Sequence, residues 1–174
     1  MPDFASFSID ERLRNGEHIE IRALRPSDRQ ALLVATEHTS DRSLYRRFFG
    51  VRREFSDEEV TSFVDVDFVN QVALVAIKRA AADEELIVAG ARYIIVRPGA
   101  AEIAFTVVDE FQGKGIAGAL LRHLVTLARM AGLRQLIAEV LPENTAMLRV
   151  LERSGLRSEK KREDGVVHIT LQLD

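Results

Sequence analysis

Cysteine is absent from the 174-residue sequence, which excludes a disulfide framework, thiolate catalysis and cysteine metal ligands together. No apolar run approaches the ~18 residues that a membrane-spanning helix needs, and the N-terminus carries acidic residues but no apolar signal-peptide core. The 24 basic and 27 acidic residues are well mixed, so no basic surface predicts nucleic-acid binding. We therefore expect a cytoplasmic protein with neither nucleic acid nor membrane as a partner.

The sequence also lacks the histidine patterns of metal sites. No HExxH or HxH pattern occurs, so we expect no metal. The histidines are far apart, at His18, His38, His123 and His168. The chain length is that of one domain, and we expect a single domain over residues 1–174 with an irregular N-terminal arm over residues 1–16.

The first third of the chain predicts a strand followed by short helices. Alternating apolar and polar residues indicate a strand near Glu17–Leu24, and Ser27 is expected to cap the next helix. A second short helix is expected from Asp41 through "RSLYRRFF". A third is expected from Ser56, where Glu59 has the spacing of a capping box.

The rest of the chain predicts a mixed sheet flanked by helices. Runs rich in β-branched residues indicate a three-stranded meander over Gln71–Val108. Apolar residues at helical spacing then predict a helix over Gly115–Ala131, ended by Gly132. A strand over Gln135–Val140, a helix over about Asn144–Arg153 and a final hairpin that turns at "EDG" complete the predicted α/β order.

Three glycines stand where the meander gives way to the long helix. Gly113, Gly115 and Gly118 form a G-x-G-x-x-G pattern. A nicotinamide-binding fold is disfavoured, because the preceding strands are expected to be antiparallel and too little chain follows for a second mononucleotide-binding half. N–H groups exposed at a helix N-terminus still predict a phosphate site. The alternative is a tight turn in which the glycines only relieve φ strain.

At this turn the sequence resembles a known family. "QGKGIA", Gln112–Ala117, fits the Q/R-x-x-G-x-G/A signature of the GNAT N-acetyltransferase superfamily, and "ENTAMLRVLERSGL" resembles its asparagine-led helix. Within the family, "SLYRRFF" and "AEIAFTV" resemble the catalytic domain of bacterial Pat-type protein lysine acetyltransferases. The resemblance implies a mostly antiparallel GNAT-like sheet with two splayed central parallel strands. It also implies acetyl-CoA as the acyl donor.

The resemblance further implies roles for individual residues. Acetyl-CoA would lie between the strands Ala101–Val108 and Gln135–Val140, with its pyrophosphate surrounded by N–H groups of the turn. Glu102 would be the general base, which we expect to be partly buried in a central strand. The implied cofactor-binding residues are Thr106, Val107, Val108, Gln112, Gly113, Lys114, Gly115, Ile116, Ala117, Gly118, Asn144 and Met147.

Some of these roles stay open at the sequence level. Lys114 would either add charge to the phosphate site or be a solvated lysine, and Asn144 would either bind the pantetheine or merely cap its helix. A backbone N–H near Val107 or Val108 would hold the oxyanion. Leu151 stands where many family members have a tyrosine acid, so the group that protonates the thiolate is unassigned.

The acceptor is the least specified part of the prediction. A primary amine on a lysine-bearing protein is our first choice, with a small amine or amino acid as the alternative, and a non-catalytic CoA-binding regulatory module as another. The acceptor pocket is expected between the early helices and the final hairpin. Acidic residues that would attract a basic protein, or simply be solvated, are Asp57, Glu58, Asp65 and Asp67. Monomer and homodimer are both open.

Overall fold

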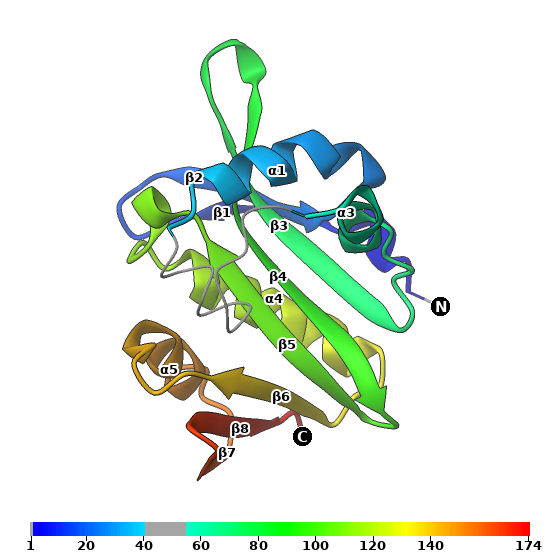
Figure 1. Cartoon of the computed structure of the whole chain (residues 1–174), viewed down its shortest axis with the longest axis vertical. Coiled ribbons are helices and arrows are strands. Elements are labelled where there is room, and N and C mark those ends of the chain that lie inside the picture. Colours follow the sequence, from blue (N-terminus) through cyan, green and yellow to red (C-terminus); the bar gives the residue numbers. More distant parts are fainter. Residues whose placement is uncertain (1, 41–54) are drawn as a thin grey trace.

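A computed structural model of the chain describes residues 2–40 and 55–174. An eight-stranded sheet runs through the molecule in the order β1-β2-β3-β4-β5-β6-β8-β7 (Figure 1). Its strand pairs are antiparallel except for β5 and β6, which confirms the predicted mixed, mostly antiparallel sheet. The strands are β1 Ser8–Arg12, β2 His18–Ala23, β3 Gln71–Arg79, β4 Glu85–Arg97, β5 Ala100–Val107, β6 Gln135–Val140, β7 Ser158–Glu163 and β8 Val166–Gln172.

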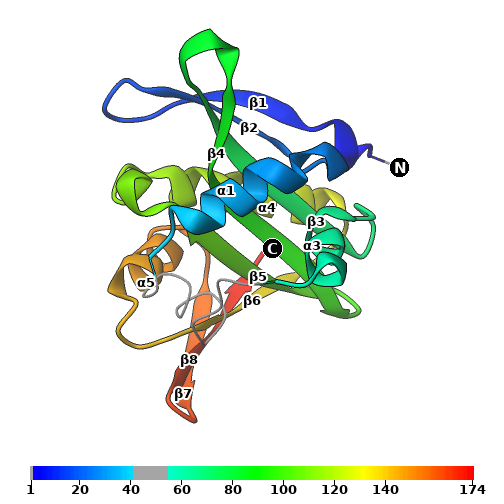
Figure 2. The ribbon, with the colours of Figure 1, turned by 45° about the horizontal axis from the view of Figure 1, so that its top comes forward.

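Helices cover both faces of this sheet. Helices α1 and α3 lie on one face, and α4 lies on the other (Figures 1 and 2). None of the helices in the described ranges is both long and apolar enough to cross a membrane. The α-helices are α1 Arg29–Glu37, α3 Asp57–Val64, α4 Ile116–Met130 and α5 Thr145–Glu152; the 3-10 turns are η1 Phe4–Ser6, η2 Pro26–Asp28, η3 Ala81–Asp83 and η4 Asp109–Phe111.

The N-terminal segment differs from its prediction. The arm expected to be irregular over residues 1–16 contains a strand, because β1 pairs with β2 in antiparallel register from Ser8 to Arg12. Glu11 of β1 accepts hydrogen bonds from Arg122 and His123 of α4, which ties this edge strand to the body of the protein. The strand is exposed along most of its length, so its sequence has no apolar alternation to reveal it.

The start of α1 also differs, while the start of α3 is as predicted. Ser27 lies inside η2 and caps nothing, and Asp28 occupies the N-cap position of α1. At α3, the hydroxyl of Ser56 accepts from the N–H of Glu59 at 3.1 Å, and the Glu59 carboxylate accepts in return. The helix predicted from Asp41 lies outside the described residues.

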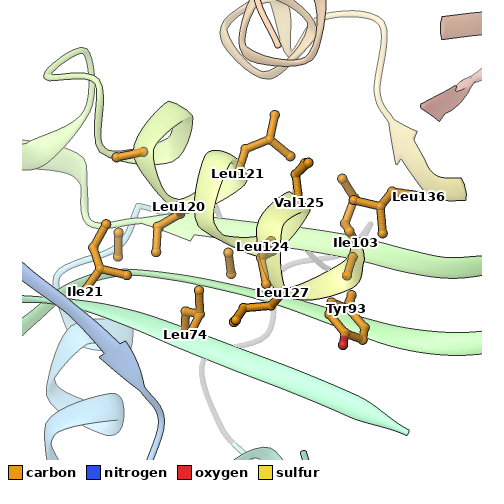
Figure 3. Packing of buried hydrophobic residues seen from close by; sticks show 14 of the residues in the cluster. Ile21, Leu74, Tyr93, Ile103, Leu120, Leu121, Leu124, Val125, Leu127 and Leu136 are labelled. Carbon is orange, nitrogen blue, oxygen red and sulfur yellow. The ribbon is translucent and has the colours of Figure 1, made fainter. Parts of the chain in front are cut away.

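Helix α4 supplies the largest part of the core. Its apolar stripe packs on the sheet against Leu74, Tyr93 and Ile103 (Figure 3). At its C-terminal end the N–H of Leu133 bonds to the carbonyl of Ala128, and Gly132 adopts a φ of 81°, which together form a Schellman cap. The buried α4 residues are Ile116, Ala119, Leu120, Leu121, Leu124, Val125, Leu127 and Ala128.

A buried ion pair joins β2 to the start of α1. Both terminal nitrogens of Arg22 donate to Asp28 at 2.8 Å, and Arg22 also donates to Glu85 on β4 at 3.0 Å. Burial raises the pKa of Asp28, but hydrogen bonds from Arg22 and from the N–H of Arg25 lower it further, so the net pKa is below its ordinary value. The pair is therefore charged at neutral pH.

We expect Asp28→Asn to lower the free energy of unfolding by about 3 kcal/mol, because it leaves the buried Arg22 without its main counter-charge. Denaturant unfolding at neutral pH measures this loss. The matched control is Asp57→Asn, which removes a fully exposed carboxylate from its ion pair with Arg29 and should change stability little. Because the pKa of Asp28 is depressed, the difference between wild type and variant should shrink only as pH falls below ~4. Equal losses in the two variants would contradict this account.

Candidate functional site

Two neighbouring strands separate at the centre of the sheet. Strands β5 and β6 pair in parallel only at three positions, which are Ala100 with Gln135, Ala101 with Leu136 and Glu102 with Ile137. Beyond Glu102 the strands diverge toward their C-terminal ends, where α5 begins on one side (Figure 1). This confirms the two splayed parallel strands expected from the sequence. We call the region between them the β5–β6 opening.

The loop that follows β5 presents unpaired backbone donors. In the described part of the chain, none of the N–H groups from Gly113 to Gly118 donates a hydrogen bond to a protein acceptor. Gly113 and Gly115 have φ values of 77° and 87°, which non-glycine residues rarely adopt. The N–H groups of Ile116, Ala117 and Gly118 also stand at the positive end of the α4 dipole. We call Gly113–Gly118 the glycine loop; it has the donors and the field of an anion site.

Open space surrounds the glycine loop. A Cβ atom built on Gly113, Gly115 or Gly118 would meet no atom within 4 Å. Packing within the protein therefore does not require glycine at these positions, although φ requires it at Gly113 and Gly115. At Gly118, whose φ is not positive, neither reason applies. The space beside Gly118 is open and could be reached by a ligand.

Two of the expected cofactor contacts are already occupied within the protein. The N–H of Gln112 donates to the carbonyl of Asp109 at 3.2 Å, and its side-chain amide donates to the carbonyl of Val107 at 3.1 Å. Gln112 therefore shapes the loop, and the run of free donors begins at Gly113. The N–H of Val108 donates to Val88 at 2.9 Å, so it is not available to hold an oxyanion.

The N–H of Val107 points to the opposite edge of β5 from the N–H of Val108. Successive N–H groups of a strand point to opposite edges, and that of Val108 points to β4. The N–H of Val107 consequently points toward the β5–β6 opening. Of the two donors considered from the sequence, only Val107 is placed for this task. The half-buried side chain of Thr106 lies on the other strand face from that of Val107.

Lys114 is not the freely solvated lysine that was one of the two alternatives considered for it. Its ammonium group donates to Glu17 at 2.9 Å and lies 5.0 Å from the centre of the Phe111 ring. Lys78 donates to the second oxygen of Glu17 at 3.0 Å and lies over the same ring. Lys114 is therefore neither freely solvated nor directed alone at the glycine loop.

The N-terminus of α5 stands at the other side of the β5–β6 opening. The Asn144 side chain accepts from the N–H of Met147 at 3.3 Å, which is the capping role considered for it. This bond uses the Asn144 carbonyl oxygen and leaves its amide nitrogen to donate. The Met147 side chain packs on the core. Leu151 on the same helix is 1% exposed and has no proton to give.

Glu102 lies at the closed end of the β5–β6 opening, in the last residue pair before the strands part. Its side chain is exposed, so the expected partial burial is wrong. No described residue forms a hydrogen bond or ion pair with its carboxylate. A carboxylate that is unpaired and open to water can accept a proton directly or through a water molecule.

An apolar cavity of about 110 Å³ lies on the face of the sheet that α1 and α3 cover. Ala104 and Thr106 of β5 line it, and alternation along the strand places Glu102 on the same face. The early helices contribute to the cavity through residues such as Leu32 and Phe63. The final hairpin does not, since no β7 or β8 residue lines it.

The expected acidic patch is partly structural. Asp67 accepts the N–H groups of Val69, Asn70 and Gln71, so it shapes its own turn, whereas Asp57 pairs with Arg29 but is fully exposed to solvent. The segment "SLYRRFF" lies outside the described residues. In the part of the chain that is described, no three His, Asp or Glu side chains gather into a metal site.

One pair beside the opening was not identified from the sequence. His168 on β8 lies 3.6 Å from Glu139 on β6, and Glu139 belongs to the part of β6 that follows the pairing with β5. Only cross-strand register brings these residues together. No local pattern could have shown their contact.

Comparisons with known proteins by sequence and by structure all find acetyltransferases. The sequence model of the acetyltransferase (GNAT) domain matches residues 18–157. Acetyltransferase Pat of Mycolicibacterium smegmatis is 32% identical over 84% of this chain and 44% of its own length, so the chain spans less than half of that relative. The crystal structure of the GNAT domain of S. lividans PAT is similar with a TM-score of 0.85 and 34% identity, covering 95% of this chain and 96% of that one.

A more distant solved structure shares the fold. It is yncA from Salmonella typhimurium, solved with its cofactor acetyl-CoA, with a TM-score of 0.72 and 20% identity over 90% of this chain and 94% of that chain.

Gly118→Val is expected to weaken coenzyme A binding at least ~10-fold, which is about 1.4 kcal/mol. The added side chain would tilt toward the helix N-terminus and stand among the free N–H groups of the glycine loop. Isothermal titration calorimetry measures the affinity, and thermal unfolding should show a folded variant, because the new Cβ has open space and an ordinary φ. Thr126→Val, an exposed position further along α4, is the control and should bind normally. Unchanged affinity in Gly118→Val would refute the loop as the binding site.

Proposed function

Because the chain belongs to the GNAT acetyltransferase family, we propose that it transfers an acetyl group from acetyl-CoA to a primary amine, most simply the side chain of a protein lysine. Acetyl-CoA is the cofactor of this family. The observation that carries the proposal is the β5–β6 opening, with the glycine loop at its wide end and Glu102 at its closed end. Along the opening, this arrangement supplies an anion site for the pyrophosphate, then an unpaired strand edge for the pantetheine arm, and then a base for the acceptor amine.

The glycine loop would hold the pyrophosphate. Its free N–H groups would donate hydrogen bonds to the phosphate oxygens, and the α4 dipole favours negative charge at this position. The pantetheine arm would lie along β5, where the strand edge beyond Glu102 lacks a partner from β6. Its amides would bond there much as an added strand does. The Asn144 amide nitrogen would donate to the arm from the α5 side.

Glu102 would remove the proton that keeps the acceptor unreactive. A lysine amine has a pKa of ~10.4 and is mostly ammonium at neutral pH. Proton transfer to the carboxylate, directly or through water, leaves a neutral nitrogen that attacks the thioester carbonyl. The carbonyl oxygen then gains negative charge, which the N–H of Val107 would stabilise.

The attack has already formed the C–N bond. As the adduct collapses, the nitrogen gives its second proton to water, the carbonyl re-forms and the C–S bond breaks. The electron pair leaves with sulfur, and the departing thiolate takes a proton from water. Water fills this role because Leu151 occupies the α5 position where a hydroxyl acid would stand.

The cavity supports an acceptor with an apolar stem and a cationic tip. It is apolar, and it shares its β5 face with the Glu102 carboxylate. A lysine side chain combines four methylene groups with an ammonium group, so its stem suits apolar walls while its tip suits a carboxylate. A small amine would satisfy the carboxylate but would use less of this surface.

Glu102→Gln is expected to lower kcat by about 10²- to 10⁴-fold at neutral pH, since it removes the proton acceptor. Affinity for acetyl-CoA should stay at the wild-type value, because Glu102 lies away from the glycine loop. A mass-spectrometric screen of proteins and small amines first identifies a lysine peptide that is acetylated. Steady-state kinetics on this peptide then give kcat. The variant should also regain activity as pH rises and the acceptor loses its proton unaided.

Glu159→Gln is the matched control for this variant. Register places Glu159 in the same row of the sheet as Glu102, three strands away through Ile137 and Thr170, and it is also exposed. Its loss should leave kcat unchanged. Near-normal turnover in Glu102→Gln would overturn the base assignment. Tight acetyl-CoA binding by the wild type with no acetylation of any screened amine would instead indicate a CoA-binding regulatory module.

A further inference from the structure

A charged cluster adjoins the glycine loop outside the β5–β6 opening. The turn between β1 and β2 lies beside the loop that precedes α4 (Figures 1 and 2), and Glu17 from this turn bridges Lys78 and Lys114. Both ammonium groups lie over one ring, at 5.2 and 5.0 Å from the centre of Phe111. We call Lys78 and Lys114 the lysine pair.

Glu17 is held in place by its own turn. Its Oε1 atom accepts from Lys114 at 2.9 Å and from the Asn15 amide at 2.7 Å, and its Oε2 atom accepts from Lys78 at 3.0 Å. Hydrogen bonds from Lys114 and then from Lys78 lower the pKa of Glu17 to about 2. The carboxylate is therefore fully ionised at neutral pH, and a single negative charge faces two positive ones.

The charge balance leaves the cluster short of one anion. Lysines at exposed sites usually spread into water, because converging ammonium groups repel each other. Here they converge on a carboxylate that offsets only half of their charge. The lysine side chains remain partly exposed, at 38% for Lys78 and 29% for Lys114, so a solute can reach them.

The position of the cluster indicates which anion fits. Lys114 stands between Gly113 and Gly115, so a ligand whose pyrophosphate occupies the glycine loop brings its next groups within one side-chain length of the lysine pair. In coenzyme A, the group next to the pyrophosphate is a ribose that carries a 3′-phosphate. A phosphate monoester carries about −1.5 to −2 charges at neutral pH and offers three acceptor oxygens.

We propose that Lys78 and Lys114 bind the 3′-phosphate of coenzyme A, and that the Glu17 carboxylate stands in for this phosphate when the cofactor is absent. This inference rests on the proposed function, because it takes coenzyme A as the ligand of the glycine loop. The lysine pair then distinguishes coenzyme A from cofactors that have the same pyrophosphate and pantetheine but no 3′-phosphate. Glu17 competes with the ligand and moderates its affinity.

The test compares coenzyme A with 3′-dephospho-coenzyme A by isothermal titration calorimetry at low ionic strength. The wild type should bind coenzyme A about tenfold more tightly or better, which is about 1.4 kcal/mol. Lys78→Met should reduce this preference to near unity by weakening coenzyme A alone, since Lys78 lies outside the glycine loop. Glu17→Gln should strengthen coenzyme A binding and leave that of the dephospho compound unchanged.

Lys160→Met is the matched control, because Lys160 is also ion-paired to a glutamate, Glu152, but lies on β7. It should alter neither affinity. Inorganic phosphate at millimolar concentration is a further arm. It should not displace coenzyme A, and displacement that Lys78→Met abolishes would identify a free-phosphate site and overturn the assignment to the cofactor.

Two other outcomes would overturn the inference in distinguishable ways. Equal wild-type affinity for the two compounds, or equal weakening of both by Lys78→Met, would refute the 3′-phosphate site while leaving the proposed function intact. Failure of the wild type to bind either compound would refute the proposed function and this site together.

Discussion

The site depends on the hydrogen bonds that β5 makes to β4 and that β6 makes to β8. These bonds continue beyond the point where β5 and β6 stop pairing with each other. Strand β5 remains paired with β4 as far as Ala89 and Val107, and β6 remains paired with β8 as far as Val140 and Val167. Each strand is thus fixed by a neighbour along the whole length over which the two diverge. The free edges cannot close without breaking those outer ladders, so the opening is part of the folded state.

Helix α4 links this opening to the core. Ile116, its first residue, is almost fully buried, while the N–H groups of the same turn stay free for a ligand. The buried stripe that packs on Leu74 and Tyr93 therefore also fixes the direction in which the glycine loop points (Figure 3). A preorganised donor array of this kind requires little reorganisation when an anion arrives.

The features that could be predicted from the sequence are those that local patterns encode. The α4 stripe, the Gly132 cap and the Ser56 capping box each depend on residues within a few positions of one another. Strand β1 was missed because most of it is exposed and its one less exposed side chain is the polar Glu11, so it has no apolar alternation. The exposure of Glu102 could not be read from its strand, because burial depends on which helices cover that face. The partner of Lys114 is Glu17, 97 positions away, and only the folded sheet brings the two together.

The exposure of Glu102 bears on the kind of acceptor. Its cross-sheet row continues through Ile137 and Thr170, which are only half-buried, so this row of the sheet is open to solvent. An enzyme for a small amine gains specificity by enclosing its substrate, because an enclosed site can contact most of a small molecule's surface. A protein acceptor covers an open surface itself and expels the water around the carboxylate as it docks. The proton acceptor would then be desolvated only in the ternary complex, which favours a macromolecular amine over a free one.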